Sequence, residues 1–180
     1  MVIPDGDVLL HAGDFTNVGL QSDVEQFVQF LKSLPHRHKI VIAGNHDISF
    51  EKAFYEENWK KFRHKTPVNH HQVVNLLQSA CTYLCDEQVT LNNHFTIYGS
   101  PWQPEFFNWG CNLPRGKPLR DKWQAIPQCD ILITHGPPLG TICRSCICGL
   151  LFCCVDLRSL SFLSFLILLL RLFLCACMME

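Results

Sequence analysis

A strand, a helix and a second strand follow one another near the start of the chain, and this order constrains the fold more than any other feature. The mostly apolar stretches 8–12 and 39–43 predict the two strands. Between them, the stretch SDVEQFVQFLKSLP has apolar residues at helical spacing and ends at Pro35. Ser22 and Glu25 predict a capping box at the start of this helix. Strands joined through a helix run parallel, so the chain is predicted to be α/β.

The following residues continue the α/β pattern. Helices are expected at 50–63, 69–79 and 119–126, and strands at 81–91, 94–102 and 130–135, with a tight turn at Asn92-Asn93. A long irregular loop at 103–118 is rich in Trp, Phe, Gly and Pro, and loops of this kind are often functional. Trp102, Trp109, Asn112 and Arg115 could reach over a site from this loop.

Composition limits the partners and the compartment of this chain. The formal net charge of −1, without a block of Lys or Arg, argues against a nucleic-acid polymer as a partner. The start MVIPDGDVLL lacks the basic and apolar regions of a secretory signal peptide, so a cytoplasmic location is expected. Cys81, Cys85, Cys111 and Cys129 are scattered, as free buried thiols of such a protein often are.

Polar, chemically active side chains follow three of the predicted strands. Asp14 follows the first strand, Asn45, His46 and Asp47 follow the second, and His135 ends the last. Carboxyl ends of parallel strands meet at one edge of a sheet, so these side chains are expected to form one site. Asp, Asn and His suit divalent ions such as Mn, Fe or Zn, and a strand-end carboxylate can bridge two ions.

His46 is better placed to act on a substrate oxygen than to share an ion, and Asp47 is expected to fix its tautomer. Each pattern alone has a simpler interpretation. Gly-Asp is a common turn, Asn-His-Asp can begin a helix, and a histidine before Gly-Pro-Pro can belong to a turn. Their occurrence in order, each after an apolar strand, favours a site.

The motifs GDFT, GNHD and ITHGPP resemble three sequence blocks of the calcineurin-like metallophosphoesterases. Over residues 4–140 the chain resembles the metallophosphoesterase-domain-containing branch of this superfamily. The flanking segments that carry this resemblance are LLHAGDF, KIVIAGNH, YGSPW, GCNLPRG and DKWQAIP. The resemblance implies two facing β-sheets flanked by helices, two divalent metal ions, and phosphate esters, including phosphodiesters and cyclic nucleotides, as substrates.

The resemblance also implies roles for the site residues. Asp14 would bridge the two ions, Asn45 and His135 would bind the second ion, and His46, supported by Asp47, would stabilise the transition state or protonate the leaving oxygen. The family's opening Asp-x-His block and closing Gly-His-x-His block are absent. We therefore expect an incomplete sandwich, at most one bound ion and impaired hydrolysis. The alternative is a non-catalytic module that binds a metal or a nucleotide.

Residues 141–180 differ in composition from the partial domain at 1–140. They are rich in Cys, Leu and Phe and lack Pro, Lys and His. The abrupt change after Gly140 favours sequence that is not native to the domain. The competing hypothesis is a membrane anchor, because residues 159–179 are long and apolar enough to span a bilayer if Arg171 is tolerated. Cys143, Cys146 and Cys148 form only half of a zinc-binding pattern.

Overall fold

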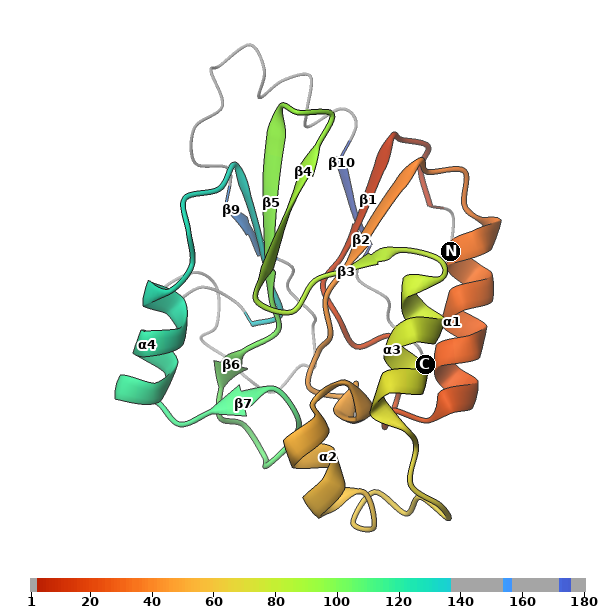
Figure 1. Cartoon of the computed structure of the whole chain (residues 1–180), viewed down its shortest axis with the longest axis vertical. Helices are drawn as coiled ribbons and strands as arrows, with labels where there is room; N and C mark the ends of the chain where they lie inside the picture. The colour runs from red at the N-terminus through yellow and green to blue at the C-terminus, as the bar shows by residue number, and fades with distance from the viewer. Residues whose placement is uncertain (1–2, 137–153, 157–171, 176–180) are drawn as a thin grey trace.

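The computed structural model describes residues 3–136, 154–156 and 172–175, which form two four-stranded sheets, one small sheet and several helices (Figure 1). The first sheet has the order β10-β1-β2-β3 and the second the order β4-β5-β8-β9. The strands are β1 (Val8–His11), β2 (His38–Val41), β3 (Thr82–Tyr83), β4 (Glu87–Leu91), β5 (Phe95–Ser100), β6 (Gln103–Pro104), β7 (Asn112–Leu113), β8 (Ile131–Thr134), β9 (Cys154–Asp156) and β10 (Leu172–Cys175). The helices are α1 (Gln21–Ser33), η1 (Ile48–Phe50), α2 (Lys52–Asn58), α3 (His70–Gln78) and α4 (Lys117–Gln124).

The predicted strand–helix–strand unit is present. β1 and β2 pair in parallel, with Val8 opposite His38 and His11 opposite Val41, and α1 connects them. The predicted capping box is wrong. The helix begins at Gln21, with Leu20 as its N-cap and no side-chain cap, so Ser22 already lies inside the first turn. Glu25 instead accepts a hydrogen bond from the Gln21 side-chain amide at 2.9 Å.

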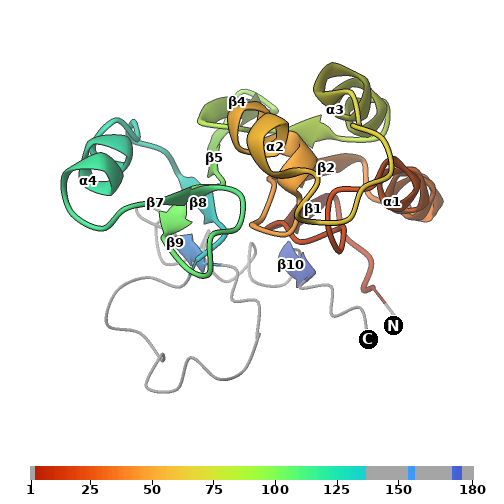
Figure 2. The same ribbon diagram turned by 90° about the horizontal axis from the view of Figure 1, so that it is seen from below.

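Side chains that alternate along the first sheet separate two apolar cores. Leu9 and Val41 face the helical side, where they pack with α1 and α3. Leu10 and Ile40 face the other side, where they meet Ile97 and Ile133 of the second sheet. Alternation of this kind is what a strand with both faces covered requires. Two sheets therefore face each other, with α1 and α3 beyond one sheet and α4 beyond the other; Figure 2 shows the same order from below. This arrangement is the mixed α/β fold predicted from the sequence.

Two local predictions need correction or refinement. The helix expected over residues 50–63 is shorter, because η1 precedes it and α2 ends at Asn58; turns follow, with Arg63 at φ 61°. The tight turn at Asn92-Asn93 is confirmed. Both asparagines have left-handed backbones, with φ of 51° and 58°, and asparagine adopts this conformation more readily than most residues.

Two short strands of the tail lie at sheet edges. β10 pairs in parallel with β1, and β9 pairs antiparallel with β8. Of the membrane helix predicted over residues 159–179, only this β10 segment belongs to the described residues, so the prediction of an anchor stays untested. None of the helices in the described ranges is long and apolar enough to cross a bilayer. Cys81, Cys85, Cys111 and Cys129 lie outside disulfides, as predicted, but only Cys111 is buried and Cys85 is exposed. Cys143, Cys146 and Cys148 lie outside the described residues.

Candidate metal centre

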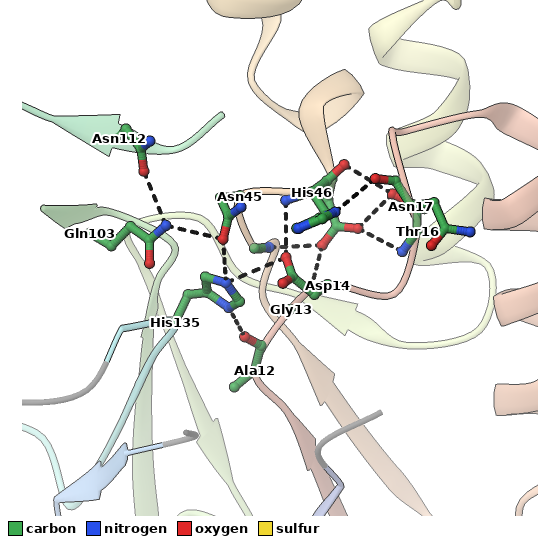
Figure 3. A network of polar contacts seen from close by, with 12 residues as sticks. Ala12, Gly13, Asp14, Thr16, Asn17, Asn45, His46, Gln103, Asn112 and His135 are labelled. Carbon is green, nitrogen blue, oxygen red and sulfur yellow. Dashed lines mark hydrogen bonds and ion pairs between the residues drawn. The ribbon is translucent and has the colours of Figure 1, made fainter. Parts of the chain in front are cut away.

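Three side chains from distant parts of the chain meet beyond the carboxyl ends of β1, β2 and β8 (Figure 3). His135 Nε2 lies 3.0 Å from Asn45 Oδ1 and 3.4 Å from Asp14 Oδ1. His135 is buried, and the other two side chains are partly buried. The sequence therefore predicted correctly which residues come together. Their role as metal ligands remains a prediction.

The two distances from His135 Nε2 match the spacing of ligands around one cation. Ligands bound at about 2.1 Å, at angles between a right angle and the tetrahedral angle, lie about 3.0–3.4 Å apart. A carboxylate oxygen, an amide oxygen and an imidazole nitrogen also form a donor set that divalent Mn, Fe or Zn accepts. Among the residues that the structure describes, no group of three or more His, Cys, Asp or Glu side chains could hold an ion. The candidate set is not such a group, because its third member is the amide of Asn45.

The second ring nitrogen of His135 is held by the main chain. His135 Nδ1 donates to the Ala12 carbonyl at 2.6 Å, which directs Nε2 at Asp14 and Asn45. Metal-ligating histidines are oriented in this way. Burial alone would lower the pKa of His135, but the hydrogen bond and the charge of Asp14 outweigh burial and raise it. Burial alone would raise the pKa of Asp14, but the contacts with His135 and with the His46 amide outweigh burial and lower it.

Two glycines allow the strand-end loops to approach this closely. A Cβ on Gly44 would lie 2.2 Å from Asp14 Oδ1 and 2.5 Å from His135 Cε1. A Cβ on Gly13 would lie 2.4 Å from the Gly44 nitrogen, and Gly13 has a φ of 97°. Asp14 itself has a left-handed backbone, with φ 57°. The site therefore depends on the absence of side chains at residues 13 and 44.

The Asp47 carboxylate links the loop after β1 to the loop after β2. Its carboxylate accepts hydrogen bonds from the backbone amides of Asp14 and Gly44, both at 2.8 Å, and from the amide and hydroxyl of Thr16, at 2.9 and 2.8 Å. Burial raises the pKa of the Asp47 carboxyl to about 7, with the charge of Asp14 adding to the shift and the donated bonds opposing it. The side chain is fully buried. Asp47 therefore holds the loops in place.

The prediction that Asp47 fixes the tautomer of His46 is wrong, because the Asp47 carboxylate faces the loop backbone instead. His46 Nδ1 donates to the Asn17 carbonyl at 2.8 Å, so a main-chain group takes the expected place of the carboxylate. The His46 ring stacks on Trp109, with centroids 4.2 Å apart and planes 29° apart. His46 is partly exposed at the edge of the site.

The segment at 103–118, predicted as an irregular loop, contains the short strands β6 and β7 and the start of α4. This segment, which we continue to call the long loop, reaches the site through residues that were only partly anticipated. Trp109 contacts His46, and the Gly110 amide donates to the Asn45 carbonyl at 3.2 Å. Trp102 instead donates to Asp86 at 2.8 Å, and Arg115 is exposed.

Sequence reasoning missed Gln103. Its Nε2 donates to Asn45 Oδ1 at 3.1 Å and to Asn112 Oδ1 at 3.0 Å. A glutamine before a proline carries no local signal for this role.

Comparisons with known proteins agree with the mixed α/β fold. The family model for calcineurin-like phosphoesterase matches residues 2–155. The chain is 51% identical over 146 residues to metallophosphoesterase domain-containing protein 1 of Homo sapiens and of Mus musculus, which covers 77% of this chain and 44% of each relative. It is 41% identical over 152 residues to the UPF0046 protein T07D4.2 of Caenorhabditis elegans, which covers 77% of this chain and 38% of that protein.

These matches extend over most of the chain, and the family match at residues 2–155 includes all the strand-end motifs. The chain belongs to the calcineurin-like phosphoesterase family. Its members are phosphoesterase hydrolases that typically use divalent metals. The chain spans less than half the length of the curated relatives named above.

Proposed function

We propose that this chain acts on phosphate esters, phosphodiesters or cyclic nucleotides through a divalent metal ion held by Asp14, Asn45 and His135. The observation that carries the proposal is the convergence of two oxygen ligands on His135 Nε2, at 3.0 and 3.4 Å. Family membership supplies the reaction class, because the family consists of phosphoesterases. Mn, Fe and Zn all suit the donor set.

Each residue has a part in this proposal. Asp14 and Asn45 supply oxygens and His135 supplies Nε2 to the ion. A bound divalent ion supplies Lewis acidity toward a phosphoryl oxygen and lowers the pKa of water. His46, partly exposed beside these ligands, is placed to protonate the leaving oxygen. Its Nδ1 donates to the Asn17 carbonyl, so Nε2 is the nitrogen left for a substrate, and it would give up its proton from the charged form of the ring.

The proposal can be tested on the purified chain by metal analysis and by hydrolysis of bis(p-nitrophenyl) phosphate with added Mn²⁺. Asp14→Asn and His135→Gln should abolish both metal retention and hydrolysis. His71→Gln, which changes an exposed histidine of α3, is the matched control and should leave both unchanged. Metal retention and hydrolysis that survive both site substitutions would overturn the proposal.

A second candidate function is a module that binds one ion, or a nucleotide through that ion, without turnover. The observation in its favour is that the converging side chains form a ligand set for a single ion. Impaired hydrolysis would follow, because two-metal clamping of attacking and leaving oxygens needs a second ion. Stoichiometry separates the two functions: two ions per chain with turnover support the enzyme, and one ion without turnover supports the module.

A further inference from the structure

Three side-chain amides form a chain of hydrogen bonds from the long loop to the candidate metal centre (Figure 3). Asn112 Nδ2 donates to the Phe106 carbonyl at 2.8 Å, so its Oδ1 faces the other way. That oxygen accepts from Gln103 Nε2 at 3.0 Å, and the same nitrogen donates to Asn45 Oδ1 at 3.1 Å. We call these three residues the amide relay.

A backbone carbonyl determines the direction of the amide relay. A carbonyl can only accept, so Asn112 must present its NH₂ group to Phe106 and its oxygen to Gln103. Gln103 must then present NH₂, whose two hydrogens serve the oxygens of Asn112 and Asn45. Each orientation follows from its neighbour, and the last one places Asn45 Oδ1 toward His135.

We propose that Gln103, held by Asn112, is a positioning residue that keeps the oxygen of Asn45, rather than its NH₂ group, turned toward the metal centre. This inference rests on the proposed function, because it concerns the same ion. The two ends of an asparagine amide are nearly equal in shape, but only the oxygen binds a cation. The orientation of the amide therefore decides whether Asn45 is a ligand.

Without Gln103 the amide relay no longer selects one orientation of the Asn45 amide. The NH₂ group of a free Asn45 side chain can face the metal centre as readily as its oxygen, and a metal would have to reverse that orientation. Gln103 opposes this orientation, because its NH₂ group would then face the NH₂ group of Asn45. Loss of a partner that orients a metal ligand typically weakens metal affinity about 10–100-fold.

The test is Mn²⁺ binding to the full chain by isothermal titration calorimetry, with the metal alone as the probe. Gln103→Met keeps the length of the side chain and removes the donor, and it should weaken binding about 10–100-fold. Gln88→Met makes the same change on an exposed residue of β4 and should leave affinity unchanged. Asn112→Leu removes the acceptor that holds Gln103 and should weaken binding by less than Gln103→Met.

The outcomes separate the amide relay from the proposed function. If the wild-type chain binds Mn²⁺ and Gln103→Met binds it within twofold, the positioning role is overturned and the metal site stands. If the wild-type chain and Asn45→Leu bind Mn²⁺ equally, the metal site itself is wrong, and the inference falls with it. Circular dichroism of the metal-free variants checks their folding, and Asn112→Leu decides the question if Gln103→Met does not fold.

Discussion

The two parts of the candidate metal centre are built in different ways. The loops after β1 and β2 are tied together by fully buried Asp47, which accepts four hydrogen bonds, and by glycines in close contact. The long loop, residues 103–118, touches the site through the partly exposed side chains of Gln103 and Trp109 and through one backbone hydrogen bond, from the Gly110 amide to the Asn45 carbonyl.

This difference indicates that the two parts have different roles. The strand-end loops determine where the ligand atoms lie, since several buried contacts hold the loop backbone in one conformation. The long loop determines how the side chains of Asn45 and His46 are oriented, since Gln103 contacts the Asn45 amide and Trp109 contacts the His46 ring. Changes in the first part should therefore affect stability and metal binding together, and changes in the second part should affect function with little loss of stability.

The largest effect is expected from Asp47→Asn. The new NH₂ group would face donors, and buried amides of Asp14 or Gly44 would lose their acceptor. Each unsatisfied buried donor costs about 1–3 kcal/mol, so the free energy of unfolding should fall by about 3 kcal/mol. Urea unfolding measures this change, with Asp5→Asn as the exposed control. A loss below about 1 kcal/mol would show that the strand-end loops do not depend on Asp47.

The next largest effect is expected on Mn²⁺ affinity, when one glycine in each part is replaced by alanine. Gly44→Ala places a Cβ 2.2 Å from Asp14 Oδ1, so the ligands must separate and Mn²⁺ affinity should fall by more than about 100-fold. Gly110→Ala, in the long loop, meets the Asn45 carbonyl at 3.2 Å and should cost only a few-fold. Calorimetric titration with Mn²⁺ measures both. Equal losses in the two variants would remove the distinction between the parts.

Trp109→Leu should separate orientation from stability. The ring of Trp109 stacks on His46, and an aromatic pair contributes about 0.5–1.5 kcal/mol beyond its buried area. We expect kcat for bis(p-nitrophenyl) phosphate to fall up to about tenfold, with unchanged Mn²⁺ affinity. Trp123→Leu, which alters an exposed tryptophan of α4, is the matched control. A loss of metal affinity in Trp109→Leu would place this residue with the strand-end loops instead.

The smallest effect is expected on the pH dependence of stability, through the contact that Glu51 makes with the long loop. Glu51 accepts a hydrogen bond from the Cys111 amide. Burial raises the pKa of the Glu51 carboxyl, although this bond opposes the shift. A carboxyl whose pKa is higher in the folded state than in the unfolded state makes the fold less stable as pH rises from about 4 through the folded-state pKa.

Glu51→Gln removes this charge and keeps an acceptor for the Cys111 amide. Its Tm should therefore slightly exceed that of the wild type at pH 8, and the difference should vanish near about pH 4, where the carboxyl is protonated. Thermal unfolding at both pH values measures the difference, and Glu57→Gln is the exposed control. A Tm below that of the wild type at pH 8 would show that the hydrogen bond outweighs burial.

Local patterns predicted most of the architecture. The apolar runs before Asp14, Asn45 and His135 are strands or lead directly out of strands, and α1 buries Val24, Phe27, Val28 and Leu31, as its spacing predicts. Boundaries were less accurate. The capping box at Ser22 is absent, since the N-cap is Leu20, two residues earlier. The helix expected to reach residue 63 ends at Asn58.

Roles that depend on a distant partner could not be read from local patterns. Asp47 follows His46 directly, and adjacency suggested that they interact; the loop turns Asp47 toward Thr16 instead. Gln103 was missed because its partner, Asn45, lies 58 residues away.

The sequence by itself determined that polar ligands stand at the ends of parallel strands, because alternation of apolar residues and the polar break after each strand are local properties of the chain. Only the tertiary structure decided which side chain faces which. Those orientations depend on left-handed backbone at Asp14 and on the close approach of Gly13 and Gly44, which become favourable only when the loops pack together.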